Sequence, residues 1–176
     1  VFLPGANVAA ARLFAEGAFS QAFVPVLAAS KQKDGEEATH ALINSVATLL
    51  TIALNVTCVV GIAGAPVLVY LLASGLKPEG FEAAALMTRW MFPYIACMSL
   101  VALVAGVLNT WKSFAIPAAT PVLLNFAMIL AAWFGAPWFQ RLGIEPIYAM
   151  AGGVMLGGIL QLVAILLAMW RMGLAP

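Results

Sequence analysis

Four long stretches of the chain contain no aspartate, glutamate, lysine or arginine, and they cover residues 38–76, 90–111, 113–140 and 146–170. Each is longer than the roughly 20 apolar residues with which a helix crosses the hydrocarbon core of a bilayer. Charged residues make up 9% of the chain and hydrophobic residues 64%, whereas about 25% of a soluble domain is charged. The sequence therefore predicts an all-α, polytopic bundle of transmembrane helices.

Five helical segments are expected within a single membrane domain that covers residues 1–176. Their approximate ranges are 7–29, 38–73, 82–109, 114–134 and 147–170. Polar or glycine-containing stretches at 31–37, 74–80 and 135–146 are the predicted loops, and residues 109–113 form a short polar link. Pro66 is expected to kink the second segment, because proline removes a backbone donor and clashes with the preceding turn.

The orientation of the bundle follows from the lysines and arginines in alternate loops. One side has Lys31, Lys33, Lys112 and Arg171, and the other has Lys77, Arg89 and Arg141. This small excess places the Lys31 loop in the cytoplasm.

Arg12 and Glu16 are the charged residues that the first segment carries within its apolar sequence. They are four residues apart and therefore share a helix face, which Ser20 extends with Gln21 beside it. Either charge would cost at least a few kcal/mol if it faced hydrocarbon, so both are expected to face protein or a water-filled cavity. This stripe is either the polar lining of a substrate path or a structural pair near the membrane boundary.

Prolines and asparagines inside the apolar segments form a second candidate feature. Proline frees carbonyl groups and bends a membrane helix, and irregular backbone is tolerated where it lines a cavity. Transporters use such broken helices, although ordinary kinking for packing is the equal alternative. The candidate hinge residues are Gly17, Pro25, Pro93, Asn109, Pro117, Pro121 and Asn125.

Gly153 and Gly157 form a GxxxG pattern in the last segment, which is typical of closely packed membrane helices. The two cysteines and the single histidine are too scattered for a metal site or a disulfide framework, so no cofactor or metal is expected. No enzyme signature is present, and a net charge of +1 gives no reason to expect a nucleic-acid partner.

Two runs of this sequence closely resemble signatures of the bacterial lipid II flippase family, MurJ (also called MviN), within the multidrug/oligosaccharidyl-lipid/polysaccharide exporter superfamily. They are residues 12–27, RLFAEGAFSQAFVPVL, and residues 106–125, GVLNTWKSFAIPAATPVLLN; a weaker match is residues 92–94, FPY. Their order and spacing, together with the polar loop at residues 31–37, are also similar to the family.

The resemblance implies about a third of a fourteen-helix transporter with two lobes around a cation-lined cavity. The chain would supply the second to sixth helices, and thus part of the N-terminal lobe. The implied function is movement of the lipid-linked peptidoglycan precursor, lipid II, from the cytoplasmic to the periplasmic leaflet by alternating access. The implied location is the bacterial inner membrane, and the implied partners are lipid II, membrane lipids and the remainder of the transporter.

The resemblance also assigns roles to residues of the first segment. Arg12 matches a family arginine and would contribute positive charge toward the diphosphate, while Glu16 would pair with or orient a cation. The chain departs from the family pattern at Ala11, where a first arginine is usual, and at Ala29 and Ser30, where Glu-Tyr is common. Residues 1–10 match poorly.

Two other functions remain open at this point. The chain could be a non-transporting membrane scaffold or the remnant of a broken gene, because it carries only part of the family's helices. It could also belong to another exporter of the same superfamily.

Overall fold

The computed structural model describes residues 18–33, 35–73 and 75–174, with side chains from Phe23 onward. Its helices are α2 (Ala18–Lys33), α3 (Gly35–Leu72), α4 (Pro78–Thr110), α5 (Ala115–Leu130), the π-helical turn η1 (Ala131–Gly135), α6 (Ala136–Arg141) and α7 (Ile147–Arg171). No strand occurs in these ranges, which confirms the predicted all-α class.

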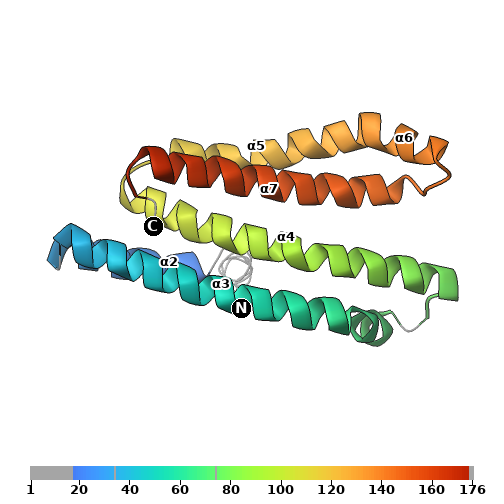
Figure 1. Ribbon diagram of the computed structural model, residues 1–176, viewed down its shortest axis with the longest axis horizontal. Coiled ribbons are helices and arrows are strands. Elements are labelled where there is room, and N and C mark those ends of the chain that lie inside the picture. Colours follow the sequence, from blue (N-terminus) through green and yellow to red (C-terminus); the bar gives the residue numbers. More distant parts are fainter. Residues whose placement is uncertain (1–17, 34, 74, 175–176) are drawn as a thin grey trace, which may run out of the picture.

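Helix α4 occupies the middle of the bundle (Figure 1). It contacts α2 and α3 on one side and α7 on the other, while α5 packs mainly on α7. Within the described residues, the backbones of α2 and α3 do not approach those of α5 and α7 closely. The bundle therefore consists of two helical layers that are joined through α4.

The main core lies at the end of the bundle where α2, α4 and α7 terminate. It joins buried side chains from the four helices α2, α3, α4 and α7, among them Leu27, Ile43, Leu108 and Ile165. Lys31 covers this end, because its Nζ lies 4.0 Å from the centre of the Trp111 ring in a cation–π contact. The two layers are thus packed together at the C-terminal end of α4.

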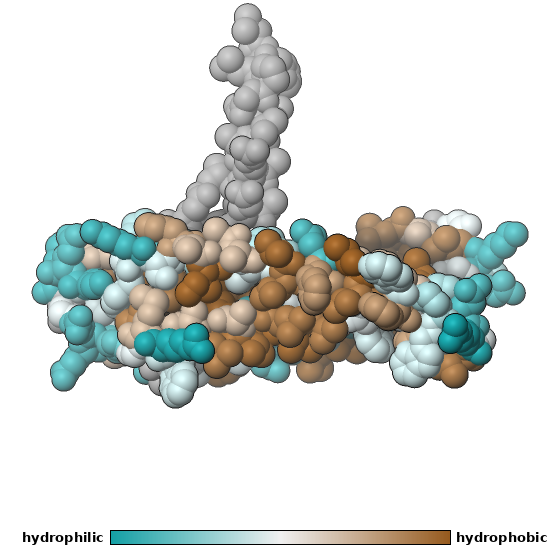
Figure 2. All heavy atoms as spheres, turned by 90° about the horizontal axis from the view of Figure 1, so that it is seen from above, coloured by the Kyte–Doolittle hydropathy of each residue, from teal (hydrophilic) through white to brown (hydrophobic). Residues whose placement is uncertain are grey.

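The outer surface of the helices is apolar over most of its length. On the face that Figure 2 shows, brown hydrophobic residues predominate in the middle of the molecule, and hydrophilic residues gather toward both ends. In the described part of the chain, four helical stretches are long and apolar enough to cross a membrane, namely Gly35–Leu72, Pro78–Thr110, Ala115–Arg141 and Ile147–Arg171. In water, such a surface would promote aggregation, whereas in a bilayer lipid chains cover it.

Helix α3 bends before its end, as its proline predicted. Pro66 lies inside the helix, and in Figure 1 the last turns of α3 are seen nearly end-on while the preceding part lies across the view. Pro66 has no N–H to donate to the carbonyl of Ile62 one turn earlier, which explains the bend at this position.

Helix ends differ from the sequence prediction in three places, the first being the start of α4 at Pro78 instead of near residue 82. The polar loop expected at residues 31–37 is largely helical, because α2 continues to Lys33 and α3 begins at Gly35, whose φ of +85° suits glycine. The helix end expected near residue 134 is wrong, since the chain continues through η1 and α6 to Arg141. Pro137 does not stop it, because proline is tolerated in the first turn of a new helix.

The GxxxG pattern brings α7 against α5, as expected. A Cβ added at Gly157 would lie 2.6 Å from Leu124 Cδ1 and 3.0 Å from Leu124 Cα. A Cβ at Gly153 would lie 3.4 Å from the carbonyl oxygen of Ala127. The two helices can therefore pack this closely because these glycines have no Cβ.

Candidate functional site

The predicted polar stripe begins ahead of the described part of the chain. Arg12, Glu16 and Gly17 lie outside the described residues, while Ser20 and Gln21 lie in the first turns of α2. By helical spacing, position 20 shares a face with Phe23 and Leu27, which are buried in the core. This face of α2 is directed toward the bundle.

Pro25 and Pro93, two of the candidate hinge residues, differ in their surroundings. Pro25 lies inside α2 and is exposed, whereas Pro93 lies inside α4 and is half-buried. Next to Pro93, the ring of Phe92 packs directly against Gly61 of α3, where an added Cβ would overlap it. The Cys58 thiol donates a hydrogen bond to the carbonyl oxygen of Phe92 at 3.3 Å. The proline of α4 thus lies at a tight α3–α4 contact.

Asn109 lies at the turn that connects α4 to α5. Its carbonyl oxygen accepts a hydrogen bond from the backbone N–H of Lys112 at 3.0 Å, and the N–H of Ser113 donates to Leu108 at 2.9 Å. Lys112 has a φ of +61°, an uncommon conformation for a residue with a side chain. The predicted polar link is therefore a tight turn held by backbone hydrogen bonds.

Pro117 and Pro121 lie beside the buried residue Thr120 of α5, which is hydrogen-bonded to the buried Gln161 of α7. Pro121 lacks the N–H that would normally bond to the carbonyl of Pro117, four residues earlier. The hydroxyl of Thr120 donates to that carbonyl instead, at 2.8 Å. Gln161 of α7 donates from Nε2 to the carbonyl oxygen of Thr120 at 2.9 Å. We call Pro117, Thr120, Pro121 and Gln161 the α5–α7 polar cluster.

Gln161 is almost fully buried, with 1% of its surface exposed. Its Oε1 has no hydrogen-bond partner among the described residues. A buried amide oxygen without a partner costs about 1–3 kcal/mol. Asn125, the last candidate hinge residue, is exposed on α5 and lies outside this cluster. The structure therefore brings together two of the seven candidate hinge residues.

Thr120 and Gln161 were not among the residues predicted from the sequence. A signal for Gln161 was present, because it is the only amide side chain in the apolar stretch 146–170, and polar residues within membrane helices usually bond across helices. Thr120 could have been found from its place directly before Pro121.

Comparison with known proteins identifies the family of this chain. The family model for "Lipid II flippase MurJ" matches residues 8–176. The chain belongs to this family. A relative named "Lipid II flippase MurJ" from Burkholderia cenocepacia is 51% identical over 167 residues, which are 94% of this chain and 32% of the relative.

Two further family members are named "Probable lipid II flippase MurJ". The one from Haemophilus influenzae is 39% identical and the one from Vibrio cholerae is 36% identical, each over 159 residues that are 85% of this chain and 30% of the relative. The chain thus spans about a third of the length of these curated relatives. Family membership and the four apolar helices together make it a multi-pass membrane protein.

No group of three or more histidine, cysteine, aspartate or glutamate side chains that could hold a metal ion occurs among the described residues.

Proposed function

We propose that this chain is part of a lipid II flippase, which moves the lipid-linked peptidoglycan precursor from the cytoplasmic to the periplasmic leaflet by alternating access. The observation that carries the proposal is the family match over residues 8–176, together with 51% identity to a relative of that name. The family name favours this function over that of another exporter of the same superfamily. The chain's part in it is transport rather than enzymatic chemistry, within the N-terminal lobe.

Arg12 supplies positive charge toward the diphosphate of the precursor in this proposal. A guanidinium presents several donors in a fixed fork that suits phosphate oxygens. Glu16 pairs with or orients a cation, and Ser20 and Gln21 extend the polar lining along α2. The burial of Phe23 and Leu27 supports this role for position 20, because it shares their face and that face is directed toward the bundle.

The protein is placed in the bacterial inner membrane with the Lys31 end in the cytoplasm. The fold supports this orientation, because Lys31 lies against Trp111, next to Lys112, and Arg171 follows the α7 residues that enter the same core. Four basic residues, including Lys33, therefore gather at this end, whereas Lys77, Arg89 and Arg141 belong to the opposite end. Basic residues favour the cytoplasmic side of a membrane protein.

Alternating access requires that the bundle change shape around the substrate. The two helical layers share the core at the Lys31 end, and elsewhere in the described part of the chain their backbones are linked through α4, so relative movement is easiest at the opposite end. Pro93 and the α5–α7 polar cluster are the candidate points of bending. The remaining candidates, Gly17, Pro25, Asn109 and Asn125, would adjust at helix ends or on exposed faces.

The test is rescue of growth in cells depleted of their own lipid II flippase by the full-length protein that contains this chain. We expect Arg12→Ala to abolish rescue at unchanged membrane abundance, and Arg12→Lys to retain part of it. Arg171→Ala is the matched control, because it removes an exposed arginine at a helix end. Equal rescue by Arg12→Ala and wild type would favour the scaffold function instead.

A further inference from the structure

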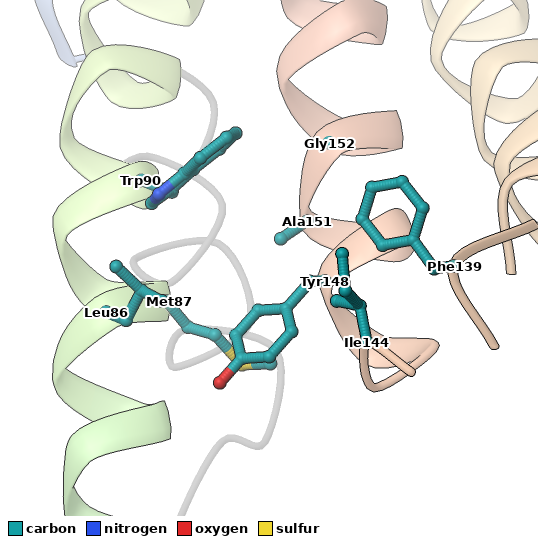
Figure 3. A pocket seen from close by; sticks show the side chains of 8 residues that line it. All are labelled: Leu86, Met87, Trp90, Phe139, Ile144, Tyr148, Ala151 and Gly152. Carbon is teal, nitrogen blue, oxygen red and sulfur yellow. The ribbon is translucent and has the colours of Figure 1, made fainter. Parts of the chain in front are cut away.

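An apolar crevice opens between α4 and the α6–α7 segment, at the end of the bundle opposite Lys31. Its volume is about 380 Å³, within the range of sites that hold small ligands. Figure 3 shows Trp90 reaching from α4 toward Ala151 and Gly152 of α7, while the Tyr148 hydroxyl points away from them. We call it the Trp90 crevice; its lining includes Leu86, Met87, Trp90, Phe139, Tyr148 and Gly152.

The crevice lies at the level of a membrane interface. Trp90 and Trp111 are 21 positions apart along α4 (111 − 90), which corresponds to about 30 Å at the rise of an α-helix. That distance equals the thickness of the hydrocarbon core, and Trp111 lies at the Lys31 end. Trp90 therefore marks the opposite interface, where aromatic residues with one polar edge are favoured.

Arg89 adds a positive charge at the same level. It is exposed, and it lines a second hollow of about 270 Å³ together with Trp90, Pro93, Ile62 of α3 and Met155 of α7. Trp90 lines both this hollow and the Trp90 crevice, so the two are neighbours.

None of the acidic side chains in the described part of the chain forms an ion pair with Arg89. A cation inside a membrane helix requires a partner or access to the interface. Lipid phosphates lie at this level and supply the missing negative charge, which Arg binds strongly. The apolar walls on both sides of Trp90 in turn suit hydrocarbon.

We propose that the Trp90 crevice and Arg89 hold one phospholipid molecule of the leaflet at this end of the bundle. Its phosphate contacts the Arg89 guanidinium, and its acyl chains lie against Trp90, in the crevice and in the hollow lined by Pro93 and Met155. This site goes beyond the proposed transport of lipid II, because it recognises a resident membrane lipid and, among the described residues, shares no lining residue with the predicted polar stripe. It needs no transport activity.

Two pairs of variants of the full-length protein test the site by native mass spectrometry with added phosphatidylglycerol. Gly152→Leu places a larger side chain at the crevice, because Gly152 lines it and no atom lies within 4 Å of an added Cβ. Gly64→Leu makes the same change at an equally open position of α3. Arg89→Gln removes the proposed phosphate partner, and Arg141→Gln removes another exposed arginine at the same end.

We expect Arg89→Gln to weaken the tightest phosphatidylglycerol binding by about tenfold, because it removes a charged hydrogen bond. We expect a similar loss for Gly152→Leu, because its side chain occupies the crevice. Gly64→Leu and Arg141→Gln should bind like the wild type. Equal binding by all four variants would overturn the proposal. It would also be overturned if a photoreactive residue at Trp90 cross-linked only to another segment of the same protein.

Discussion

Gly152 and Gly157 lie five positions apart on α7, and they differ in the space available for a side chain. An added Cβ at Gly157 would press on the side chain and backbone of Leu124, whereas at Gly152 it would meet no atom within 4 Å. We expect Gly157→Ala to force α5 and α7 apart and to lower the free energy of unfolding by about 1–3 kcal/mol. Thermal unfolding in detergent measures this, with Gly152→Ala as the control, and equal melting temperatures would contradict the packing argument.

Thr120 compensates for a donor that Pro121 lacks. Replacement by valine keeps the shape but leaves the carbonyl oxygen of Pro117 without the 2.8 Å hydrogen bond. We expect Thr120→Val to destabilise the protein by about 1–2 kcal/mol and Thr120→Ser to preserve most of the stability. Thermal unfolding distinguishes the two, and a valine variant as stable as serine would show that the hydroxyl contributes nothing.

At the residue scale, the sequence predicted which residues have a structural role, but not which residues they contact. The spacing of Gly153 and Gly157 indicated close packing, but not that α5 would be the partner. Pro121 was predicted to bend its helix, whereas the hydrogen bonds of the neighbouring Thr120 to Pro117 and of Gln161 to Thr120 were not predicted. The bond from Gln161 to Thr120 joins residues 41 positions apart, and local periodicity carries no information on such a pair.

Helix α5 continues where the sequence predicted a loop, and this difference has a local cause. The sequence predicted a loop from Gly135 to Pro146. Instead, a π-helical turn widens the helix, with the N–H of Ala136 bonded to the carbonyl oxygen of Ala131. Gly135 packs against Ala149 of α7, where an added Cβ would lie 3.3 Å away. A contact with another helix thus overrides the local preference for a turn.

The proline inside α5, Pro121, permits a prediction at the scale of this element. Pro121→Ala restores an N–H that can bond to the carbonyl oxygen of Pro117, so we expect an equal or higher melting temperature. Under the proposed function, the straighter helix should rescue flippase-depleted cells less well. The matched control is Pro25→Ala, at an exposed position of α2. Full rescue by a stabilised Pro121→Ala variant would show that Pro121 contributes to packing and not to transport.

The end of the molecule that contains Lys31 is the more basic one and holds the main core. The proposed orientation places this end in the cytoplasm, and this can be tested. Single cysteines at Lys33 and Lys77, in a background with Cys58 and Cys97 replaced by alanine, report the side of the membrane on which each loop lies. We expect a membrane-impermeant maleimide to label Lys77→Cys in intact cells and Lys33→Cys only after permeabilisation. The reverse pattern would invert the proposed orientation.

At this scale, the charge-free stretches alone predicted an all-α membrane bundle, because a helix is the simplest way to satisfy backbone groups in lipid. The arrangement around α4 could not be predicted, since it depends on which apolar faces pack together. Arg12 and Glu16 were identified from their cost in lipid, and they remain predictions because they lie outside the described residues.

The central claim is that this chain belongs to the machinery that moves lipid II across the membrane. The direct measurement is the amount of precursor in each leaflet, read with a membrane-impermeant probe, before and after depletion of the full-length protein. We predict that depletion confines the precursor to the cytoplasmic leaflet and that re-expression restores it to the periplasmic leaflet. An unchanged distribution after depletion, in cells with no other flippase, would contradict the account.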